Sequence, residues 1–277
     1  SLAFVFALSP FAASTARAEV PPPADVAYPG TIAIEVDATD LSQRIFRVKQ
    51  TMPVQAGPLT LLFPAWLPGN HRPAGPIDKI AGLEITADGQ RLDWKRDPLE
   101  VYAFHVDVPA GVSSLSMQYQ YLTPTDRGQG RVVMTPNMLN LQWNAVVLYP
   151  AGHYASGIRY AATVEYPAGF QAATALDVAS RVGNTVHYQA VPLDILVDSP
   201  VYAGRYFRTF DLAPGAKVPV RLNVVADAAK YLEAEPEHIE QHRELVKQAL
   251  ELFGSQHYDH YDFLFSLSGQ MSGNGLE

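Results

Sequence analysis

The sequence predicts a mainly β protein: an N-terminal antiparallel β-sandwich or saddle-shaped domain, followed by a short α+β segment. Apolar and polar residues alternate with a period of two from residue 31 to about residue 226, the pattern of strands that bury one face. The 22 prolines and 19 glycines give a turn density that is high for a helical protein. After Val225 the apolar period lengthens to about 3.6, which indicates a helix.

Composition sets the broad class of the protein. Of the 277 residues, 48% are hydrophobic and 17% are charged, values typical of a globular chain and not of a disordered one. The formal net charge is -8 and the basic residues form no runs, so nucleic acid is not an expected partner. The sequence has no cysteine, which excludes disulfides and thiolate zinc sites, and any bound metal would use histidine and carboxylate ligands.

Residues 1–18 have the pattern of a clipped secretory signal peptide. An apolar stretch from Leu2 to Ala13 precedes an A-x-A cleavage signal that ends at Ala18. A transmembrane helix needs roughly 20 apolar residues, so we expect no membrane association after cleavage. The mature protein would be periplasmic or secreted, and residues 19–27 would form an extended, proline-rich linker. The alternative is a buried strand or an ordinary apolar N-terminus.

Residues 28–226 are predicted to form the all-β N-terminal domain. Strict alternation marks strands near residues 32–36, 101–108 and 115–121. Between the strands lie turn signals that combine glycine with a residue favouring chain reversal, namely Asp88-Gly89, Ala110-Gly111, Ala168-Gly169, Gly183-Asn184 and Pro214-Gly215. Short strands joined by such turns predict antiparallel neighbours, and the absence of a fixed-period repeat argues against a propeller.

Residues 227–277 are predicted to be the incomplete start of a second, α+β domain. Pro236 suits a first helical position, and Gly254 is placed to end a helix over residues 237–253. The helix carries an apolar stripe made of Ile239, Val246, Ala249, Leu250 and Phe253. A strand over residues 261–267 follows, and a glycine-rich loop comes after it.

The helix also carries two candidate metal ligands. His238 and His242 are four residues apart and project from one face, as the zinc ligands of an HExxH helix do. That motif places its glutamate directly after the first histidine, where this sequence has Ile239. Glu240 lies about 200° around the helix from His238. We therefore expect both histidines to be solvated surface residues.

The other polar residues near the end of the sequence give weaker signals. His257 and His260 precede a strand and are expected at the surface, where they could pair with Asp259 or Asp262. The serines in this region lack the G-x-S-x-G elbow of a hydrolase nucleophile, and the glycines lack the lysine of a phosphate-binding loop.

Two clusters of aromatic residues and proline are predicted to form packed corners. One is FPAWLPGNH, residues 63–71, and the other begins at Trp143 and ends at residues 149–153. Proline and tryptophan at the end of a strand usually make a rigid corner. Stacking of a carbohydrate ring on Trp66 or Trp143 is the alternative interpretation.

Taken in order, several segments resemble the glycyl aminopeptidase family of zinc metallopeptidases. The resemblance covers about residues 28–277 and is carried by LLFPAWLPGNH, LEVYAFHVDVP, LQWNAVVLYPAGH, LVDSPVYAGRYF and HYDHYDFLFSLSGQMSGNGLE. Its most specific parts are the W-x-P-G corner, the N-x-x-x-x-Y-P-x-G segment and the final G-x-G-L-E.

The resemblance implies a plan similar to aminopeptidase N: an all-β domain, then a thermolysin-like domain in which an HExxH helix and a downstream glutamate bind one zinc ion. This sequence contains no HExxH. The zinc ligands and the general base would therefore lie beyond Glu277 in the full-length enzyme. The chain itself is expected to hold no catalytic residue, no metal ligand and no zinc, and to be inactive. Family members often carry a C-terminal PDZ-like domain.

The resemblance also implies a substrate-binding loop. Gly273, Asn274, Gly275 and Glu277 correspond to the Gly-Ala-Met-Glu-Asn segment of aminopeptidase N. Glu277 would pair with the α-ammonium group of a peptide substrate, and the glycines would let the backbone approach it. The expected substrates are peptides with a small N-terminal residue such as Gly or Ala. Leu276 and Glu277 can alternatively be read as a cloning scar.

Two further classes of protein stay open. The chain could be a non-catalytic β-sandwich binding module for a glycan or a protein partner, or a structural domain. A binding module should complete its fold, whereas an incomplete catalytic domain should leave the helix stripe at Ile239, Val246 and Leu250 poorly covered. The sequence does not predict an oligomeric state.

Overall fold

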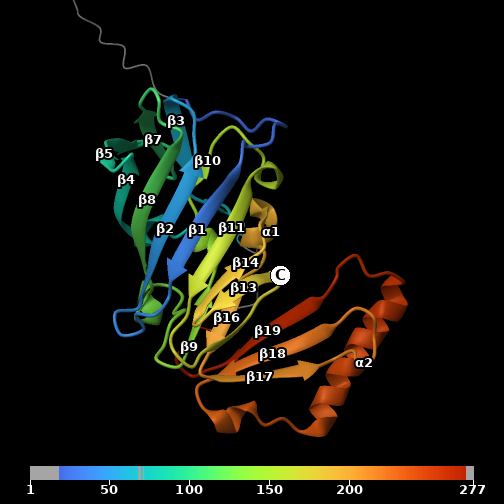
Figure 1. The fold of residues 1–277 in the computed structure, drawn as a ribbon. Helices are drawn as coiled ribbons and strands as arrows, with labels where there is room; N and C mark the ends of the chain where they lie inside the picture. The colour runs from blue at the N-terminus through green and yellow to red at the C-terminus, as the bar shows by residue number, and fades with distance from the viewer. Residues whose placement is uncertain (1–18, 68–69, 71, 273–277) are drawn as a thin grey trace, which may run out of the picture.

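The computed structural model describes residues 19–67, 70 and 72–272. Figure 1 shows two parts, which we call the β lobe (residues 19–205) and the C-terminal lobe (residues 206–272). The protein is mainly β, which confirms the predicted fold class. No helix in the described part of the chain is both long enough and apolar enough to cross a membrane.

The β lobe is built on one large, twisted sheet. Among the described residues its strand order is β13 (Val178–Val182), β14 (Thr185–Tyr188), β11 (Arg159–Glu165), β1 (Thr31–Asp37), β2 (Ile45–Pro53), β8 (Ser114–Leu122), β4 (Ile80–Ala87) and β5 (Gln90–Leu92), with β15 (Val191–Pro192) paired to β11. The strands expected near residues 32–36 and 115–121 are therefore present as β1 and β8. Ile32, Ile34 and Val36 are buried, as their alternation predicts.

One pairing in this sheet differs from the antiparallel expectation. β1 is antiparallel to β2 but parallel to β11 along its full length, from Thr31 beside Arg159 to Asp37 beside Glu165. A tight turn can join only antiparallel neighbours, and these two strands are far apart in sequence. No local turn signal could therefore have indicated their pairing.

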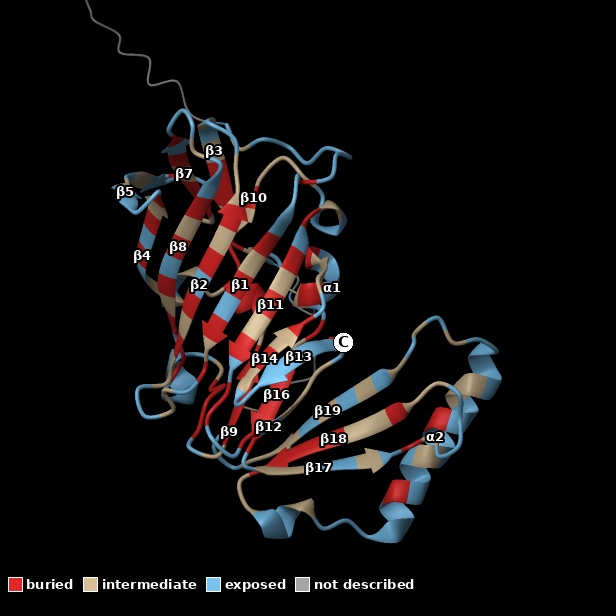
Figure 2. Ribbon diagram, viewed as in Figure 1, coloured by how far each residue is buried: buried red, intermediate tan, exposed pale blue. Residues whose placement is uncertain are grey.

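Two smaller sheets complete the β lobe. One contains β10 (Tyr149–Pro150), β3 (Gly57–Leu62), β7 (Ala103–Val108) and β6 (Trp94–Arg96), and the other contains β12 (Gln171–Ala173), β16 (Val201–Gly204) and β9 (Met138–Leu141). The helix α1 (Leu193–Val197) and 3-10 turns at Ile77–Lys79, Arg127–Gln129, Trp143–Ala145 and Ala155–Gly157 lie in the connections. Figure 2 shows the buried residues concentrated along the central strands of this lobe.

The segment predicted as a linker is attached to the β lobe. Ala24 pairs with His153, and the Ala24 N–H donates to the Gly152 carbonyl over 3.1 Å. The Tyr28 N–H donates to the Gly157 carbonyl over 2.9 Å. These backbone bonds hold residues 24–28 along the edge of the lobe.

The C-terminal lobe is a small α/β unit. Its sheet contains β17 (Tyr206–Asp211), β18 (Val220–Ala226) and β19 (Tyr261–Leu267), with a 3-10 turn at Ala229–Leu232 and the helix α2 (Pro236–Phe253). β17 and β18 are antiparallel, whereas β18 and β19 are parallel and are connected through α2. The predicted domain boundary at residue 226 falls inside this sheet, and we propose residues 205 and 206 as the division that keeps the sheet whole.

The helix and the final strand confirm the local predictions. α2 begins with Pro236 in its first turn and ends where Gly254 adopts a left-handed conformation, with φ of 66°. The Gly254 N–H then donates to the Leu250 carbonyl over 2.9 Å, which satisfies one of the last carbonyls of the helix. β19 spans residues 261–267, the range that its apolar pattern predicts.

The helix stripe, which an incomplete catalytic domain is expected to leave poorly covered, is covered at two of its three positions, the outcome that a completed fold predicts. Ile239 and Val246 are buried, because they pack against Leu212 and Val220 of the sheet, and Leu250 is half-buried. Exposed apolar side chains lie on α2, at Leu245, Leu252 and Phe253, and on the edge strand β19. There Tyr261 is 45%, Phe263 37% and Phe265 50% exposed.

Candidate functional site

The residues predicted to bind substrate, Gly273, Asn274, Gly275 and Glu277, lie outside the described residues. The chain that leads to them is described as far as Ser272. The Ser268 hydroxyl donates to Asp227 Oδ1 over 2.9 Å and accepts the N–H groups of Gln270 and Met271, each at 3.0 Å. Ser268 therefore shapes the turn that follows β19.

The turn directs the chain against the β lobe. The Ser272 N–H donates to the Val132 carbonyl over 3.1 Å, and the Val132 N–H donates to Ser272 Oγ over 2.9 Å. Arg127 Nη2 donates to the Met271 carbonyl over 3.3 Å. Met271 is itself buried in a cluster with residues of both lobes, Met138, Tyr202 and Val225. These contacts fix the start of the glycine-rich loop beside residues 127–132.

A polar pocket adjoins this segment. Its volume is about 450 Å³, and the described residues that line it come mainly from three stretches of the β lobe, within residues 67–79, 129–133 and 142–145, together with Tyr121 of β8 and Pro124. Val132 bonds to Ser272, while its neighbours Arg131 and Val133 line the pocket.

The first wall of the polar pocket is the predicted W-x-P-G corner. Trp66 pairs with Pro73, and the N–H groups of Ala74 and Gly75 both donate to the Ala65 carbonyl, over 2.8 and 2.9 Å. A Cβ atom on Gly75 would lie 1.9 Å from the Pro64 carbonyl oxygen, so only glycine allows the two chains to approach this closely. Residues 68, 69 and 71 of the motif lie outside the described residues.

Buried amides form the third wall. Asn140 Oδ1, Gln142 Nε2 and Asn144 Oδ1 are buried and have no hydrogen-bond partner, and the last two residues line the pocket. Asn144 is only 6% exposed. An unsatisfied buried polar atom costs about 1–3 kcal/mol, so such atoms at a cavity indicate a missing polar ligand or water. Sequence reasoning treated this N-x-x-x-x-Y-P-x-G segment as a corner and did not identify its amides as site residues.

Basic side chains dominate the charge of the pocket. Of the described residues that line it, Arg72, Lys79 and Arg131 are cationic, and Asp78 is the one carboxylate. Lys79 and Asp78 form an ion pair at 3.2 Å. Burial raises the pKa of Tyr121 to about 12, with smaller opposing effects of Asp78 and Arg131, so this phenol is neutral at physiological pH. The pocket is therefore locally positive in a chain of net charge -8.

The predicted histidine candidates are placed elsewhere. His238 and His242 are both exposed on α2, and His242 Nδ1 lies 2.6 Å from the His238 carbonyl oxygen. His260 Nδ1 pairs with Asp262 at 2.6 Å, and its Nε2 lies 3.4 Å from Asp177 of the β lobe. His260 thus links the two lobes.

Zinc does not fit the described residues. Within that part of the chain, no group of three or more histidine, cysteine, aspartate or glutamate side chains is arranged to hold a metal ion. No step of chemistry is therefore derived through a metal for the described chain.

The two tryptophans of the predicted corners have different environments. Trp66 is 67% exposed and lines a shallow groove with Tyr149 and Tyr154. Trp143 is fully buried, and its Nε1–H donates to the Ser199 carbonyl over 2.9 Å. Carbohydrate stacking on Trp143 is therefore excluded, whereas Trp66 could stack on a ring.

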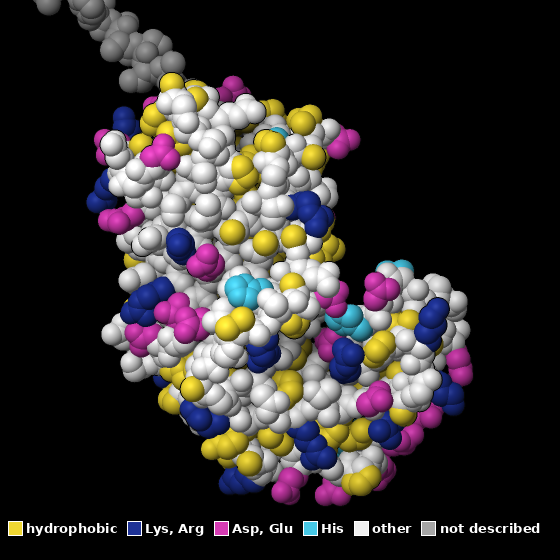
Figure 3. Space-filling model, in the orientation of Figure 1, with side chains coloured by type: hydrophobic (Ala, Val, Ile, Leu, Met, Phe, Trp, Pro, Cys, Tyr) yellow, Lys and Arg dark blue, Asp and Glu magenta, His cyan; other side chains and the backbone are white. Residues whose placement is uncertain are grey.

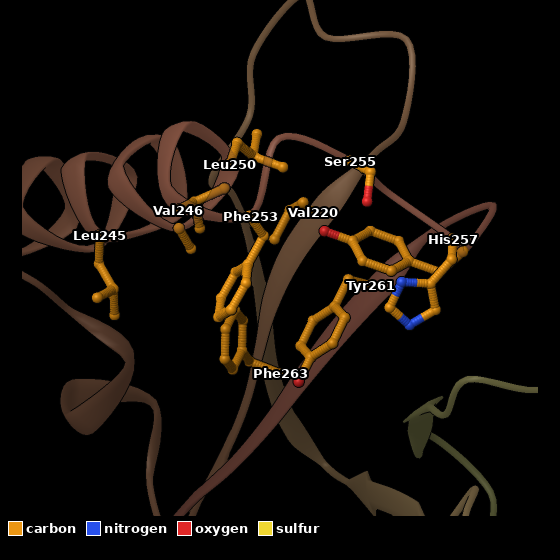
Figure 4. A pocket seen from close by; sticks show the side chains of 11 residues that line it. Val220, Leu245, Val246, Leu250, Phe253, Ser255, His257, Tyr261 and Phe263 are labelled. Carbon is orange, nitrogen blue, oxygen red and sulfur yellow. The ribbon is translucent and has the colours of Figure 1, made fainter.

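An apolar hollow lies in the C-terminal lobe, between α2 and β19. Its volume is about 420 Å³. Figure 4 shows Val246 and Leu250 of the helix above the rings of Phe253, Tyr261 and Phe263. Figure 3 shows hydrophobic side chains, in yellow, at the surface of this lobe. The hollow contains few polar groups, so it is a packing surface and not a site for chemistry.

Comparison with known families identifies the class of protein. Residues 33–205 match the Peptidase M61 N-terminal domain, and the chain belongs to this family. The match ends at the last residue of the β lobe. No curated protein matches the chain.

A solved structure shares the fold. An aminopeptidase N family protein from Idiomarina loihiensis is 18% identical, with a TM-score of 0.73 over 89% of this chain and 40% of that chain. An M1 zinc metallopeptidase from Deinococcus radiodurans is 14% identical, with a TM-score of 0.49 over 87% of this chain and 56% of that chain. The chain therefore spans less than two thirds of either protein.

Proposed function

We propose that this chain is the N-terminal portion of an exported zinc aminopeptidase that removes small N-terminal residues such as Gly and Ala from peptides. Membership of the Peptidase M61 N-terminal domain family supports a peptidase parent. The fold shared with the Idiomarina protein continues past the family match into the C-terminal lobe, because it covers 89% of the chain. Assignment to the glycyl aminopeptidases rests on the quoted sequence resemblance.

One observation carries the proposal that peptides bind here. The mutual hydrogen bonds of Ser272 and Val132 hold the start of the glycine-rich loop against Val132, whose neighbours Arg131 and Val133 line the polar pocket. The loop would supply Glu277 for the α-ammonium group of the substrate. The buried amides of Gln142 and Asn144 would supply polar contacts below it. Pockets with a few convergent polar groups are the usual places where small ligands bind.

The catalytic apparatus would lie in the chain that follows Glu277. A zinc ion there would act as a Lewis acid and lower the pKa of a bound water molecule. The aromatic face of β19 supports further chain, because Tyr261, Phe263 and Phe265 are all exposed on an edge strand. An exposed, apolar edge strand is normally paired or covered in a finished domain.

The leader-like residues 1–18 support export to the periplasm or the outside of the cell. They lie outside the described residues. N-terminal sequencing of the protein recovered from a periplasmic fraction would test this part of the proposal. We expect cleavage after Ala18, and a protein that keeps these residues in the cytoplasm would contradict it.

The enzymatic proposal is tested by extending the chain. The coding sequence after the Glu277 codon is expected to encode an HExxH motif, and the extended protein should hydrolyse Gly- and Ala-p-nitroanilide faster than Leu- or Phe-p-nitroanilide. A chelator should abolish that activity and zinc should restore it. The 277-residue chain should be inactive with or without zinc. A stop codon directly after Glu277 would contradict the proposal.

A stop codon directly after Glu277 would favour the alternative, a binding module for a glycan or a protein. The exposed ring of Trp66 is the observation that supports this alternative. A soluble oligosaccharide that quenches or shifts the Trp66 fluorescence, with loss of the effect in Trp66→Ala, would then identify a glycan as the ligand.

A further inference from the structure

The strongest unassigned feature is the guanidinium group of Arg131 in the polar pocket. Arg131 lines the pocket and is half-buried, and within the described chain it forms no ion pair with a carboxylate. The ionisable groups that act on it are the phenols of Tyr121 and Tyr202, which are neutral at physiological pH. Burial lowers the pKa of this guanidinium, which shows that it has lost part of its hydration.

A bound ligand of opposite charge would compensate the hydration that Arg131 has lost. A partly desolvated charge needs an opposite charge or strong hydrogen bonds. Most buried arginines obtain both from a carboxylate of their own chain. Here the one carboxylate among the described residues that line the pocket is Asp78, which is 70% exposed and already paired with Lys79 at 3.2 Å.

The neighbouring groups favour an anion. Gln142 contributes the N–H groups of an unpartnered, buried Nε2, and Arg72 and Lys79 add positive charge at the rim. A carboxylate accepts hydrogen bonds and donates none, and it matches the planar fork of arginine in a bidentate pair. The donors of this pocket are therefore complementary to a carboxylate.

We propose that the polar pocket binds a carboxylate group of the peptide ligand, with Arg131 as its ion-pair partner and Gln142 as a hydrogen-bond donor. The inference deepens the proposed function and rests on it for the identity of the ligand as a peptide. A carboxylate can come from the C-terminus of a short peptide or from an acidic side chain. Both present the same acceptor oxygens.

Titration calorimetry on the full 277-residue chain distinguishes the two sources. One arm compares Gly-Ala with Gly-Ala amide, and the other compares Gly-Glu amide with Gly-Gln amide. In at least one arm the carboxylate ligand should bind about 10-fold or more tightly, the size of a charge-assisted bidentate interaction. Arg131→Gln should remove the preference and Arg131→Lys should reduce it, because lysine keeps the charge but lacks the fork.

A matched control removes a guanidinium elsewhere. Arg91 is 66% exposed and pairs with Glu84 at 3.2 Å on the surface of β5. Arg91→Gln should leave the carboxylate preference unchanged. The midpoint of thermal unfolding of Arg131→Gln should equal that of the unsubstituted chain. If the midpoint is lower, the carboxylate preference of Arg131→Lys alone decides the test.

The outcomes separate this inference from the proposed function. Equal binding of acids and amides in both arms overturns the inference and leaves the peptide site standing. Arg131-dependent binding of succinate without binding of any peptide supports the carboxylate site and contradicts the proposed function. Tighter binding of inorganic phosphate than of any carboxylate, lost in Arg131→Gln, overturns the carboxylate assignment. Absence of binding by all probes contradicts both.

Discussion

Replacing Gln142 by methionine should stabilise the protein and impair its site. Gln142 Nε2 is buried without a hydrogen-bond partner, and such an atom costs about 1–3 kcal/mol. Methionine has a similar length and no branch, so Gln142→Met removes the polar atom with little change in shape. We expect the free energy of unfolding to rise by about 1–2 kcal/mol. The midpoint of thermal unfolding should then rise by a few degrees, at about 2–4 °C per kcal/mol for a chain of this size.

Urea unfolding followed by tryptophan fluorescence is the suitable assay, because Trp143 lies next to the substituted residue and is fully buried. The midpoint should move to higher urea while the slope m stays constant. Gln118→Met is the matched control. Gln118 is exposed on β8, and its replacement should change the stability by no more than about 0.5 kcal/mol.

The same variant should bind the carboxylate peptides less tightly, since it lacks the donor. A gain in stability with a loss of binding is the usual relation for a residue kept for function. If Gln142→Met instead lowers the free energy of unfolding by about 1 kcal/mol or more, the amide is paired in the folded protein. The polar lining of the pocket would then be structural, and our reasoning about the site would be refuted.

Three further predictions concern stability. Gly75→Ala should lower the free energy of unfolding, measured with urea, by about 3 kcal/mol or more, because the new Cβ would lie 1.9 Å from the Pro64 carbonyl oxygen. An unchanged free energy of unfolding would mean that this wall of the pocket can move to accommodate the methyl group. Asn223→Ala should lower the free energy of unfolding by about 2 kcal/mol, because the buried Asn223 amide donates to Asp262 over 2.8 Å. An unchanged midpoint of urea unfolding would argue against this hydrogen bond. The pKa of Tyr121 is about 12 in the folded protein and 10.0 in the unfolded chain, so its contribution to the free energy of unfolding should be constant up to about pH 10 and fall between pH 10 and 12. Urea unfolding at pH 8 to 12 would measure this loss. In a Tyr121→Phe variant the free energy of unfolding should fall less steeply over the same range.

Local signals predicted the elements whose cause is local. α2 follows from its apolar stripe, from Pro236 at its start and from Gly254 at its end, and the structure places all three as expected. β19 has the predicted bounds because its apolar run lies between turn residues. The predicted corner at residues 63–71 contains a paired chain reversal, with Trp66 beside Pro73.

The parts that were missed depend on contacts between distant segments. The sequence pattern gave no sign that β1 pairs in parallel with β11, because the intervening chain is long and carries no turn that dictates the pairing. The sheet of β17, β18 and β19 likewise joins strands on both sides of the helix, and the change of period near Val225 gives no sign of that pairing.

The candidate site likewise combines segments that the sequence indicated with residues that it did not. The sequence indicated the glycine-rich loop and the corner, but it treated Asn144 as part of a packed segment and did not single out Arg131 at all. Neither residue is unusual in its local context. Their importance arises because residues 67–79, 129–133 and 142–145 converge on one cavity beside Ser272.

The sequence by itself therefore determined the mainly β class, the helix, the last strand and the family resemblance, since periodicity, capping and motif order act over short stretches of chain. Only the tertiary structure decided which distant strands pair, which face of β19 remains exposed and which side chains line the polar pocket. The physical reason is that burial, unsatisfied hydrogen bonds and unpaired charge are properties of the space around a group. That space is filled by residues far away in the sequence.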